Sequence, residues 1–486
     1  MNYFDIFHYI VTAILIFDFA AIVTVIFFER KNPASSLAWI LLLSFIPLLG
    51  FVLYLFLGSG FRFHKRRLYA KKSGRDEDYE DALLRELKER NQRLFEAAGE
   101  SRGRLLQYLE REGDGCYTED NRIEVFCDGN DLFPRLLDDI RSAKKHIHLL
   151  YYIFKDDRIG GEIVEALRER ARAGVEVRLL YDGIGSLLSF GPGFHELRKD
   201  GGEVKVFSPM FGTFTSSLNL NYRNHRKIVV IDGEIGYVGG MNVGDEYLSR
   251  NPRLSPWRDT HVRMTGSAVW FLQERFLMDW SHVIDKPLGT PESLMKYFSP
   301  AIETGKRGVQ VTSGGPDTEG NPIKGGLLRM FYGAGKSIYI QTPYFAPDES
   351  IVDALQIAAR TGVDVRLMIP EKADHKLVHK ATFGYARQIL APGVRVFMYR
   401  GFLHAKTSVV DAAVATIGTA NLSNRSFNLN FEVNIFVHNE KFAEEQESIF
   451  RHDLENCEEL TEEWFKNQSA FSRILYNGAR LISPLI

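Results

Sequence analysis

One pattern of strand, helix and strand occurs twice in the chain, and this duplication limits the folds that are open to it. The first copy contains "AKKHIHLLYYIF" (residues 143–154) and "ALRERARAGVEVRLLYD" (residues 166–182). The second contains "GKSIYIQTPYF" (residues 335–345) and "ALQIAARTGVDVRLMIP" (residues 354–370). A helix that connects two apolar strands is typical of a right-handed βαβ crossover. The repeat is longer than a solenoid period, so we expect a duplicated α/β domain with parallel or mixed sheets.

A short polar motif is duplicated as well. "HRKIVVID" (residues 225–232) and "HAKTSVVD" (residues 404–411) share the pattern H-x-K-x4-D. After the same interval they continue into "GGMN" (residues 239–242) and "GTAN" (residues 418–421). A single short match is weak evidence of function. Two matches with the same continuation, inside a chain that is already doubled, are hard to reach by accident.

The spacing within each motif indicates which residues can act together. Alternation along a strand places the histidine and the lysine on one face and the aspartate on the other, next to a turn. The histidine and lysine can therefore address one ligand, whereas each aspartate is expected to brace the scaffold. The candidate catalytic residues of the two motifs are His225, Lys227, Asp232, His404, Lys406 and Asp411.

These residue types suit a phosphodiester substrate. Lysine and asparagine donors, here with Asn242 and Asn421, can neutralise the oxygens of a phosphorus atom. One imidazole can attack the phosphorus while the other protonates the departing alkoxide. For either histidine alone, a hydrogen-bonded core residue is the simpler interpretation. The duplicated context favours the catalytic interpretation for His225 and His404.

The N-terminus predicts a membrane segment. Residues 7–28 are largely apolar and residues 35–57 carry no charge, and each stretch is long enough to span a bilayer. A secretory signal peptide would have a shorter apolar region followed by a cleavage site. We therefore expect a transmembrane helical hairpin over residues 1–60. A kink at Pro47 and Gly50, giving a re-entrant hairpin, is the alternative.

Charge and composition divide the rest of the chain. A basic segment follows the apolar stretches and, by the positive-inside tendency, marks a cytoplasmic side near anionic lipid. A charged, helix-favouring connector follows it. The predicted divisions are a membrane hairpin (1–60), a juxtamembrane segment and connector (61–120), a first half (121–290) and a second half (300–486). The basic residues are Arg62, Lys65, Arg66, Arg67, Lys71, Lys72 and Arg75.

Composition excludes several classes of function. A formal net charge of −2 with 45% apolar residues argues against bulk capture of nucleic acid. Three cysteines without metal-ligand spacing predict neither a disulfide framework nor a zinc site. The sequence contains no P-loop and no dinucleotide fingerprint, so it predicts no nucleotide cofactor.

The doubled H-x-K-x4-D with G-G/S/T-x-N resembles the phospholipase D superfamily. The resemblance implies an α/β fold of two similar phospholipase D-like halves that share one active site, with no metal, no cofactor and a phosphohistidine intermediate. It implies that His225 is the nucleophile and His404 the general acid and base. Lys227, Lys406, Asn242 and Asn421 then fall on phosphate-binding positions.

The superfamily also has an acidic residue downstream of each motif, which orients that motif's histidine as a triad carboxylate does. Asp259 and Glu432 are the best matches, although the interval from the asparagine differs between the two copies. Asp245 and Glu246 are nearby alternatives that we expect at the surface.

Further segments resemble the bacterial cardiolipin synthase branch, among them "NYRNHRK", "PWRDTHVR", "QTPYFAPDE" and "YRGFLHAK". That resemblance implies a multi-pass protein of the bacterial cell membrane, with its catalytic part cytoplasmic. It would bind phosphatidylglycerol and other anionic phospholipids and make cardiolipin and glycerol from two phosphatidylglycerol molecules. Another donor or acceptor, such as phosphatidylethanolamine, water or another alcohol, is one alternative, and a lipid-binding protein with a decayed site is another. The oligomeric state stays open.

Apolar residues beside the motifs have two interpretations. Phe402 and Leu403 precede His404, and Phe211 and Phe214 lie in the loop before His225. They could line a lipid groove that excludes water from the phosphohistidine. Core packing is the equally good alternative.

Overall fold

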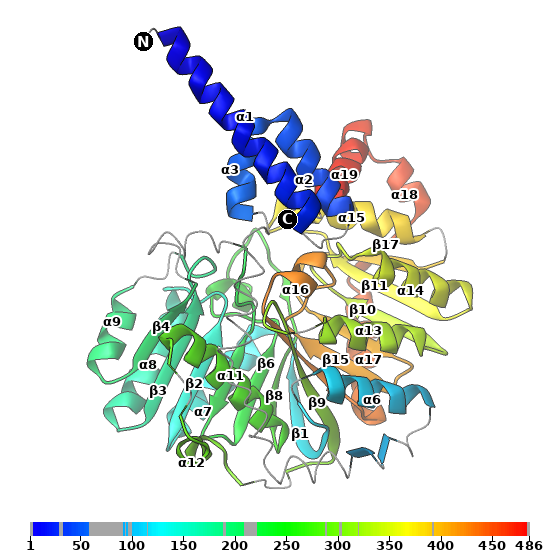
Figure 1. The fold of residues 1–486 in the computed structure, drawn as a ribbon. Coiled ribbons are helices and arrows are strands. Elements are labelled where there is room, and N and C mark those ends of the chain that lie inside the picture. The colour runs from blue at the N-terminus through cyan, green and yellow to red at the C-terminus, as the bar shows by residue number, and fades with distance from the viewer. Residues whose placement is uncertain are drawn as a thin grey trace.

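The computed structural model describes residues 3–28, 33–57, 91–92, 94–95, 100–113, 115–187, 191–208, 221–286, 289–300, 304–318, 320–390 and 393–483. The basic juxtamembrane residues 62–75, together with Phe211 and Phe214, lie outside these residues. Two α/β units dominate Figure 1 and lie side by side, one coloured cyan to green and the other yellow to orange.

The first unit is built on three parallel strands. β2 (His146–Tyr151), β3 (Glu176–Asp182) and β4 (Glu203–Phe207) are joined through α8 (Arg158–Arg172) and α9 (Pro192–Lys199), as the βαβ prediction requires. Antiparallel strands complete a mixed sheet. The remaining elements are β1 (Thr118–Phe126), α7 (Gly129–Ser142), β5 (Ile228–Ile231), β6 (Ile235–Gly239), η2 (Asp245–Leu248), β7 (Trp257–Arg258), β8 (His261–Thr265), α11 (Ala268–Ile284), α12 (Pro291–Leu294) and η3 (Met295–Tyr297).

The second unit repeats this plan. β10 (Ser337–Gln341), β11 (Asp364–Pro370) and β12 (Arg395–Tyr399) are parallel, with α14 (Glu349–Arg360) and α15 (Lys376–Leu390) as crossovers. The unit also contains β9 (Arg307–Gly314), α13 (Pro322–Tyr332), β13 (Phe402–Leu403), β14 (Thr407–Val410), β15 (Val414–Gly418), α16 (Asn424–Asn428), β16 (Glu432–Val437), α17 (Glu440–Leu454), β17 (Cys457–Leu460), α18 (Glu462–Lys466) and α19 (Ala470–Ile482).

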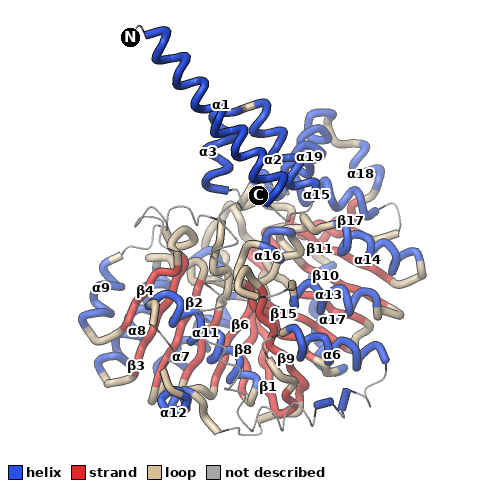
Figure 2. The backbone as a smooth tube through the Cα atoms, in the orientation of Figure 1, coloured by secondary structure: helices blue, strands red, loops and turns tan. Residues whose placement is uncertain are grey.

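The two units join through their first strands, because β1 pairs antiparallel with β9. In the described parts of the chain, fifteen strands form one hydrogen-bonded series in the order β17-β12-β11-β10-β14-β15-β16-β9-β1-β8-β6-β5-β2-β3-β4. The strands run through the middle of the body with helices outside them (Figure 2). A shared apolar core contains Val230 and Val262 from the first unit and Val409 and Val433 from the second. The prediction of a duplicated α/β fold is confirmed.

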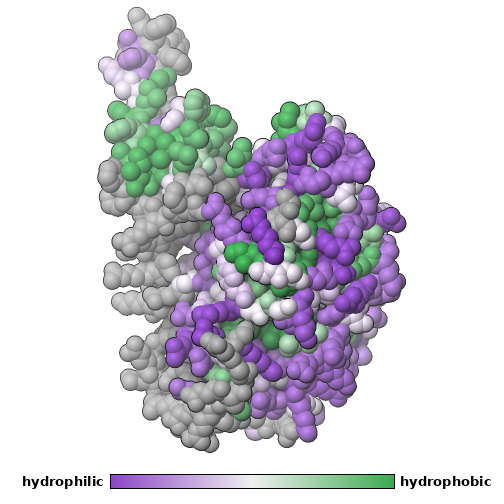
Figure 3. Space-filling view, turned by 90° about the vertical axis from the view of Figure 1, so that its right-hand side faces the viewer, coloured by the Kyte–Doolittle hydropathy of each residue, from purple (hydrophilic) through white to green (hydrophobic). Residues whose placement is uncertain are grey.

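Helices also form at the N-terminus. α1 (Tyr3–Phe28) packs against α2 (Pro33–Phe45) and α3 (Pro47–Leu57), and the helix breaks before Pro47, because proline removes a backbone donor. These helices project from one end of the body, and apolar side chains gather there in the space-filling view (Figure 3). No helix of the described residues has both the length and the apolar character needed to cross a membrane. The transmembrane hairpin therefore stays a prediction.

The connector is seen in part. α6 (Glu100–Glu112) buries Leu105 and Leu109 against the second unit, where it contacts α13. Its amphipathic spacing explains this packing, since one apolar face needs a partner. The domain boundaries proposed from the sequence stay predictions.

Candidate active site

His225 lies immediately before β5, at a contact between the two units. Its neighbour Asn224 forms a parallel bridge with Phe431 of the second unit, and the His225 amide donates to the Phe431 carbonyl at 2.9 Å. This backbone contact places the His225 imidazole beside Glu432, the residue that follows Phe431. His225 Nδ1 lies 2.8 Å from Oε2 of Glu432.

His404 has the same relation to the first unit. β13 pairs parallel with β7, which sets Leu403 opposite Arg258, and the His404 amide donates to the Arg258 carbonyl at 2.6 Å. His404 Nδ1 then lies 2.7 Å from Oδ2 of Asp259. Each histidine is therefore held by a carboxylate from the other unit.

This exchange corrects one expectation. The sequence resemblance paired Asp259 with His225 and Glu432 with His404, whereas both carboxylates contact the histidine of the opposite motif. The physical reason is the parallel backbone contact between the units, which aligns each carboxylate with the partner unit's histidine. Because a carboxylate accepts, each Nδ1 carries the proton, and each neutral ring keeps a lone pair on Nε2.

The two lysines are buried beside the histidines. Lys227 Nζ donates to the His225 carbonyl at 2.6 Å, and Lys406 Nζ donates to the His404 carbonyl. Burial lowers the pKa of Lys406 to about 8, against the attraction of Asp259 and Glu432. Burial, with repulsion from Lys406, also holds the pKa of Lys227 well below its ordinary value. Since these charges come from both units, the two motifs form one electrostatic site.

The surroundings of both histidines favour the neutral form of the imidazole. Burial lowers the pKa of His225 to about 4, and Lys227 and Lys406 add to the shift while Glu432 opposes it. Burial and Lys406 lower the pKa of His404 as well, while Asp259 opposes this shift. A neutral imidazole is the form that can attack a phosphorus atom.

Both carboxylates are ionised partners of these rings. Burial alone would raise the pKa of Glu432, but His225 and Lys227 hold that pKa below its ordinary value. For Asp259, burial is likewise outweighed by His404 and Lys406, and its pKa is also lowered. A buried, ionised carboxylate can stabilise the imidazolium that forms when a proton is taken up.

The asparagines that follow the motifs lie beside the site in different arrangements. Asn242 Oδ1 accepts from the amide of Ile153 at 3.1 Å, and its Nδ2 donates to the Tyr247 hydroxyl at 2.5 Å. Asn421 Oδ1 is buried and has no hydrogen-bond partner in the structure. Phosphate binding by these two side chains stays a prediction.

Asp232 and Asp411 do not contact the histidines. Asp232 accepts from three backbone amides, residues 144–146, at 2.7–2.9 Å. Asp411 accepts from those of residues 335–337 at 2.7–2.8 Å. They therefore tie the far end of β5 and β14 to the start of β2 and β10, as their opposite strand parity suggested. These contacts fit the expected scaffold role of both aspartates, and their inclusion among the candidate catalytic residues stays a prediction.

Aromatic side chains enclose the two rings. Tyr152 meets His225 edge-on, with ring centroids 5.0 Å apart, and the Trp257 ring centroid lies 5.5 Å from that of His404. Phe402 stacks on His404 at 5.7 Å and is fully buried, as is Leu403, so both belong to the core. The lipid-groove interpretation of Phe402 and Leu403 is wrong. Sequence reasoning missed Tyr152 and Trp257, although Tyr152 lies in "AKKHIHLLYYIF" and Trp257 in "PWRDTHVR".

Arg226, the middle residue of the first motif, was also missed. Its side chain is fully buried and donates to both oxygens of Asp279 at 2.7 and 2.9 Å. Its Nε donates to the Glu432 carbonyl at 3.1 Å, which fixes the strand that carries this carboxylate. An arginine at a strand start next to apolar residues was the available signal, because arginine is rarely buried without a partner.

One difference between the repeats has a direct explanation. Thr419 Oγ1 donates to Glu432 Oε2 at 2.6 Å. At the matching position of the first copy, a Cβ on Gly240 would lie 2.0 Å from Oδ1 of Asp259, which excludes any side chain. The second copy thus uses a hydroxyl where the first copy leaves room for the carboxylate.

Expectations for two neighbouring acidic residues had different outcomes. Asp245 is partly exposed and pairs with Arg250 at 2.5 Å. Glu246 was expected at the surface but is buried, and it pairs with Lys155 at 2.6 Å. That expectation is wrong, because η2 packs Glu246 against the strand end that carries Lys155.

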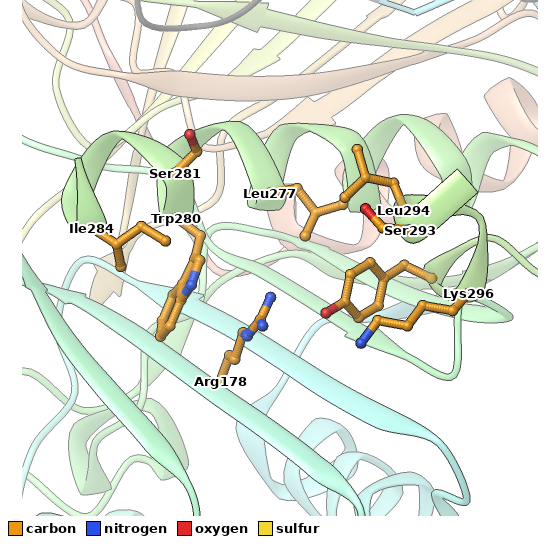
Figure 4. A pocket seen from close by; sticks show the side chains of 9 residues that line it. Arg178, Leu277, Trp280, Ser281, Ile284, Ser293, Leu294 and Lys296 are labelled. Atoms are coloured by element: carbon orange, nitrogen blue, oxygen red, sulfur yellow. The ribbon is translucent and has the colours of Figure 1, made fainter. Parts of the chain in front are cut away.

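A separate cavity of about 190 Å³ lies between α11, β3 and η3, as Figure 4 shows. Arg178, Trp280 and Lys296 line it, and Arg178 and Lys296 both pair with Glu176. Glu176 and Arg178 lie at the starting end of β3, whereas the motif histidines and lysines lie beyond the opposite end of the strands. This cavity is therefore not part of the candidate active site.

Two α/β units that share paired imidazoles, lysines and carboxylates define a phospholipase D-like protein. The sequence matches the family "Cardiolipin synthase, PLD-like domain" over residues 136–252 and 327–454, and "Phospholipase D-nuclease N-terminal" over residues 16–59. The chain belongs to the cardiolipin synthase family of phospholipase D-like proteins.

Individual relatives agree with this family. The chain is 43% identical to the major cardiolipin synthase ClsA of Bacillus subtilis (strain 168), over 96% of each chain. It is 39% identical to a cardiolipin synthase of Listeria innocua, over 98% of this chain and 99% of that protein. The phosphatidylserine synthase of Haemophilus influenzae Rd KW20 is similar in fold, with a TM-score of 0.60 and 15% identity over 80% of this chain and all of that one.

Proposed function

We propose that this protein transfers a phosphatidyl group from one phosphatidylglycerol molecule to a hydroxyl of another, forming cardiolipin and free glycerol. The observation that carries the proposal is the pair of buried imidazoles, each hydrogen-bonded through Nδ1 to a carboxylate of the opposite unit. Full-length relatives named cardiolipin synthase support the choice of substrate.

In the first step, Nε2 of His225 attacks the phosphorus of the donor lipid. The bond between phosphorus and the glycerol oxygen breaks, and His404 gives the departing alkoxide the Nε2 proton that it took from the acceptor hydroxyl in the preceding turnover. Glu432 holds the proton on His225 Nδ1, so the lone pair stays on the attacking nitrogen. The products of this step are phosphatidyl-His225 and glycerol.

In the second step, neutral His404 takes the proton of the acceptor hydroxyl. The acceptor oxygen attacks the same phosphorus, and the bond to His225 Nε2 breaks. Asp259 stabilises the imidazolium that forms at His404, because it is ionised and 2.7 Å from Nδ1. One phosphodiester replaces another, so the exchange needs no nucleotide.

The two lysines supply the positive charge for this chemistry. Lys227 and Lys406 are buried, and their attraction to a phosphate is therefore stronger than in water. We assign Asn242 and Asn421 to the same phosphate oxygens. Nδ2 of Asn242 carries two hydrogens and uses one on the Tyr247 hydroxyl, so the other can donate to the substrate.

We also propose that residues 1–60 form a transmembrane hairpin in the bacterial cell membrane, with the catalytic units on the cytoplasmic side. The match of residues 16–59 to an N-terminal region of related proteins supports this placement. Alkaline extraction of bacterial membranes should leave the full chain in the pellet. A reporter enzyme that works only in the cytoplasm should be active when it is fused after residue 483. A reporter that works only outside the cytoplasm should be inactive at the same position. The opposite result contradicts the topology.

The transfer reaction is tested with the full chain in vesicles of phosphatidylglycerol labelled in its glycerol headgroup. Cardiolipin and free labelled glycerol should appear in equal amounts, and His225→Ala should yield neither. Acid-labile phosphate on the quenched protein should be present in the wild type and absent from this variant. Normal cardiolipin formation by His225→Ala would contradict the mechanism.

Other donors and acceptors are separated by a mixed-lipid assay. Vesicles that contain phosphatidylglycerol and phosphatidylethanolamine with distinct acyl chains give products whose masses identify donor and acceptor. Release of phosphatidic acid would instead identify water as the acceptor. A lipid-binding protein with a decayed site would give no product and no phosphorylated histidine.

A further inference from the structure

A row of exposed apolar side chains runs along α19. The row follows helical spacing and repeats on one face of the helix. The opposite face buries Tyr476 and Ala479 against α15, where Phe383 stacks on Tyr476 at 5.5 Å and Gly384 allows close approach of the two helices. The exposed residues are Phe471, Ile474, Leu475, Leu481 and Ile482, of which Phe471, Ile474 and Leu481 are about 70% exposed.

The charged residues of α19 and of its partner helix α15 are all basic. The sequences of α15 and α19 contain no aspartate and no glutamate, although acidic residues outnumber basic ones in the whole chain. The positive field of this helix pair is therefore local, and it complements an anionic surface. The basic residues of the pair are Lys376, Lys380, Arg387, Arg473 and Arg480.

The position of α19 also points to a membrane. α19 lies at the same end of the molecule as α1, α2 and α3, as Figure 1 shows. In Figure 3, apolar atoms cover the N-terminal helices, and one of the apolar patches on the largely hydrophilic body lies at the corresponding end. A bilayer that holds the N-terminal helices would therefore be within reach of α19.

We propose that α19 is a second membrane contact, an interfacial helix that lies on an anionic bilayer with Phe471, Ile474 and Leu481 among the lipid chains. The proposal rests on the proposed function, which places the catalytic units at a membrane. An amphipathic helix with apolar residues on one face and only basic charges beside them is the form that binds such a surface. Its contact would set the orientation of the active site toward the lipid.

The chain provides a matched control. Ile474 on α19 and Ile357 on α14 are the same residue type, and both are exposed, at 68% and 48%. In Figure 1, α14 lies farther from the N-terminal helices than α19 does. Both side chains are largely exposed and neither belongs to the buried core, so both variants should fold as the wild type does.

The first measurement does not depend on catalysis. The three native cysteines of the full chain are replaced by serine, and a polarity-sensitive label is attached at Ile474→Cys or Ile357→Cys. In phosphatidylglycerol vesicles with nitroxide lipids, quenching should be about threefold greater at position 474 than at position 357. Equal quenching at the two positions overturns the proposal. A label at position 474 that reports an apolar surrounding but is not quenched by nitroxide lipids also overturns it, because protein then covers the row.

The second measurement uses activity. Ile474→Glu should lower kcat/KM for phosphatidylglycerol in vesicles about fivefold, while Ile357→Glu should stay within about twofold of wild type. Both variants should match wild type on short-chain phosphatidylglycerol dispersed as monomers. If wild type makes cardiolipin and the two variants behave alike, the α19 contact is wrong and the proposed function stands. If wild type makes no cardiolipin but the label at 474 is quenched, the contact stands and the proposed function is wrong.

Discussion

The two histidines of the site occupy repeated positions but different electrostatic surroundings. His225 is influenced by two lysines, Lys227 and Lys406, and by one carboxylate, Glu432. His404 is influenced by one lysine, Lys406, and by two carboxylates, Asp259 and Asp374. The duplicated scaffold therefore sets equal geometry, while the charges around it favour different protonation states.

This difference supports the separate roles that we propose for the two imidazoles. Two ammonium groups oppose protonation of His225, which keeps its Nε2 lone pair available for attack. The additional carboxylate at His404 favours the imidazolium that must protonate a leaving alkoxide. The assignment of nucleophile and general acid, which the sequence supported only through family resemblance, thus has a physical basis in the charge distribution.

The sharpest test of this comparison replaces each histidine in turn. His225→Ala should lower cardiolipin formation on the order of 10,000-fold and should abolish the phosphoenzyme, because no nucleophile is left. His404→Ala should lower cardiolipin formation about 1,000-fold, because the alkoxide then departs unprotonated. Mass spectrometry of the lipid products measures cardiolipin formation, and quenching in alkaline denaturant, in which the phosphorus–nitrogen bond survives, measures the phosphoenzyme.

A nitrophenyl phosphodiester lipid distinguishes the two roles further, because nitrophenolate leaves without a proton. His404→Ala should still form phosphoenzyme and release a burst of nitrophenolate, whereas His225→Ala should not. The reverse pattern, with a burst only in His225→Ala, would assign the nucleophile to the other half.

The crossed carboxylates give the next largest effect. Glu432→Gln should lower formation of the phosphoenzyme about 100-fold, because the amide no longer stabilises positive charge on His225. Asp259→Asn should instead slow proton transfer at His404. With the nitrophenyl substrate, whose leaving group needs no proton, the burst of this variant should stay close to that of the wild type. If both substitutions reduced the burst equally, the pairing of Glu432 with the nucleophile and of Asp259 with the general acid would be contradicted.

Lys406 predicts how activity depends on pH. Its pKa is about 8, so the ammonium that neutralises the phosphate is lost as pH rises through that value, and kcat/KM should fall. Lys406→Arg should keep the positive charge and move this fall to higher pH. An unchanged alkaline limb in Lys406→Arg would exclude Lys406 as its origin.

The contribution of Lys406 to protein stability should rise with pH over the range in which activity falls. The folded pKa of Lys406 is below the value of about 10.4 for an unfolded lysine, so between pH 8 and that value the unfolded chain binds more protons. The contribution of Lys406 to the free energy of unfolding therefore rises with pH there. Chemical denaturation at each pH separates this contribution from the loss of activity.

Much of this site could be predicted from the sequence because its residues lie in short, repeated motifs. The duplicated fold, the motif histidines and lysines, and the bracing role of Asp232 and Asp411 follow from periodicity and strand parity. The break at Pro47 follows from the missing backbone donor.

The pairing across the units could not be predicted in this way. Nothing within either repeat shows that Phe431 lies beside Asn224, or that Arg258 lies beside Leu403. These contacts join residues far apart in the sequence and depend on how the units dock. The burial of Glu246 and the partners of Arg226 depend on tertiary packing for the same reason.

The smallest expected effect on catalysis concerns the aspartates that the two repeats use alike. Asp232 and Asp411 have positive φ angles of 56° and each accepts from three backbone amides, and asparagine tolerates that conformation.

Asp232→Asn or Asp411→Asn should each lower the free energy of unfolding by about 1–3 kcal/mol, since one accepting oxygen is lost. Because the sites are in separate units, the double variant should show an additive loss. The kcat of the folded protein should stay within about twofold of wild type, since neither carboxylate contacts His225 or His404 and the proton transfers do not involve them. Urea denaturation together with initial rates tests this directly: a kcat loss comparable to that of Glu432→Gln, at unchanged stability, would return the aspartates to the catalytic machinery.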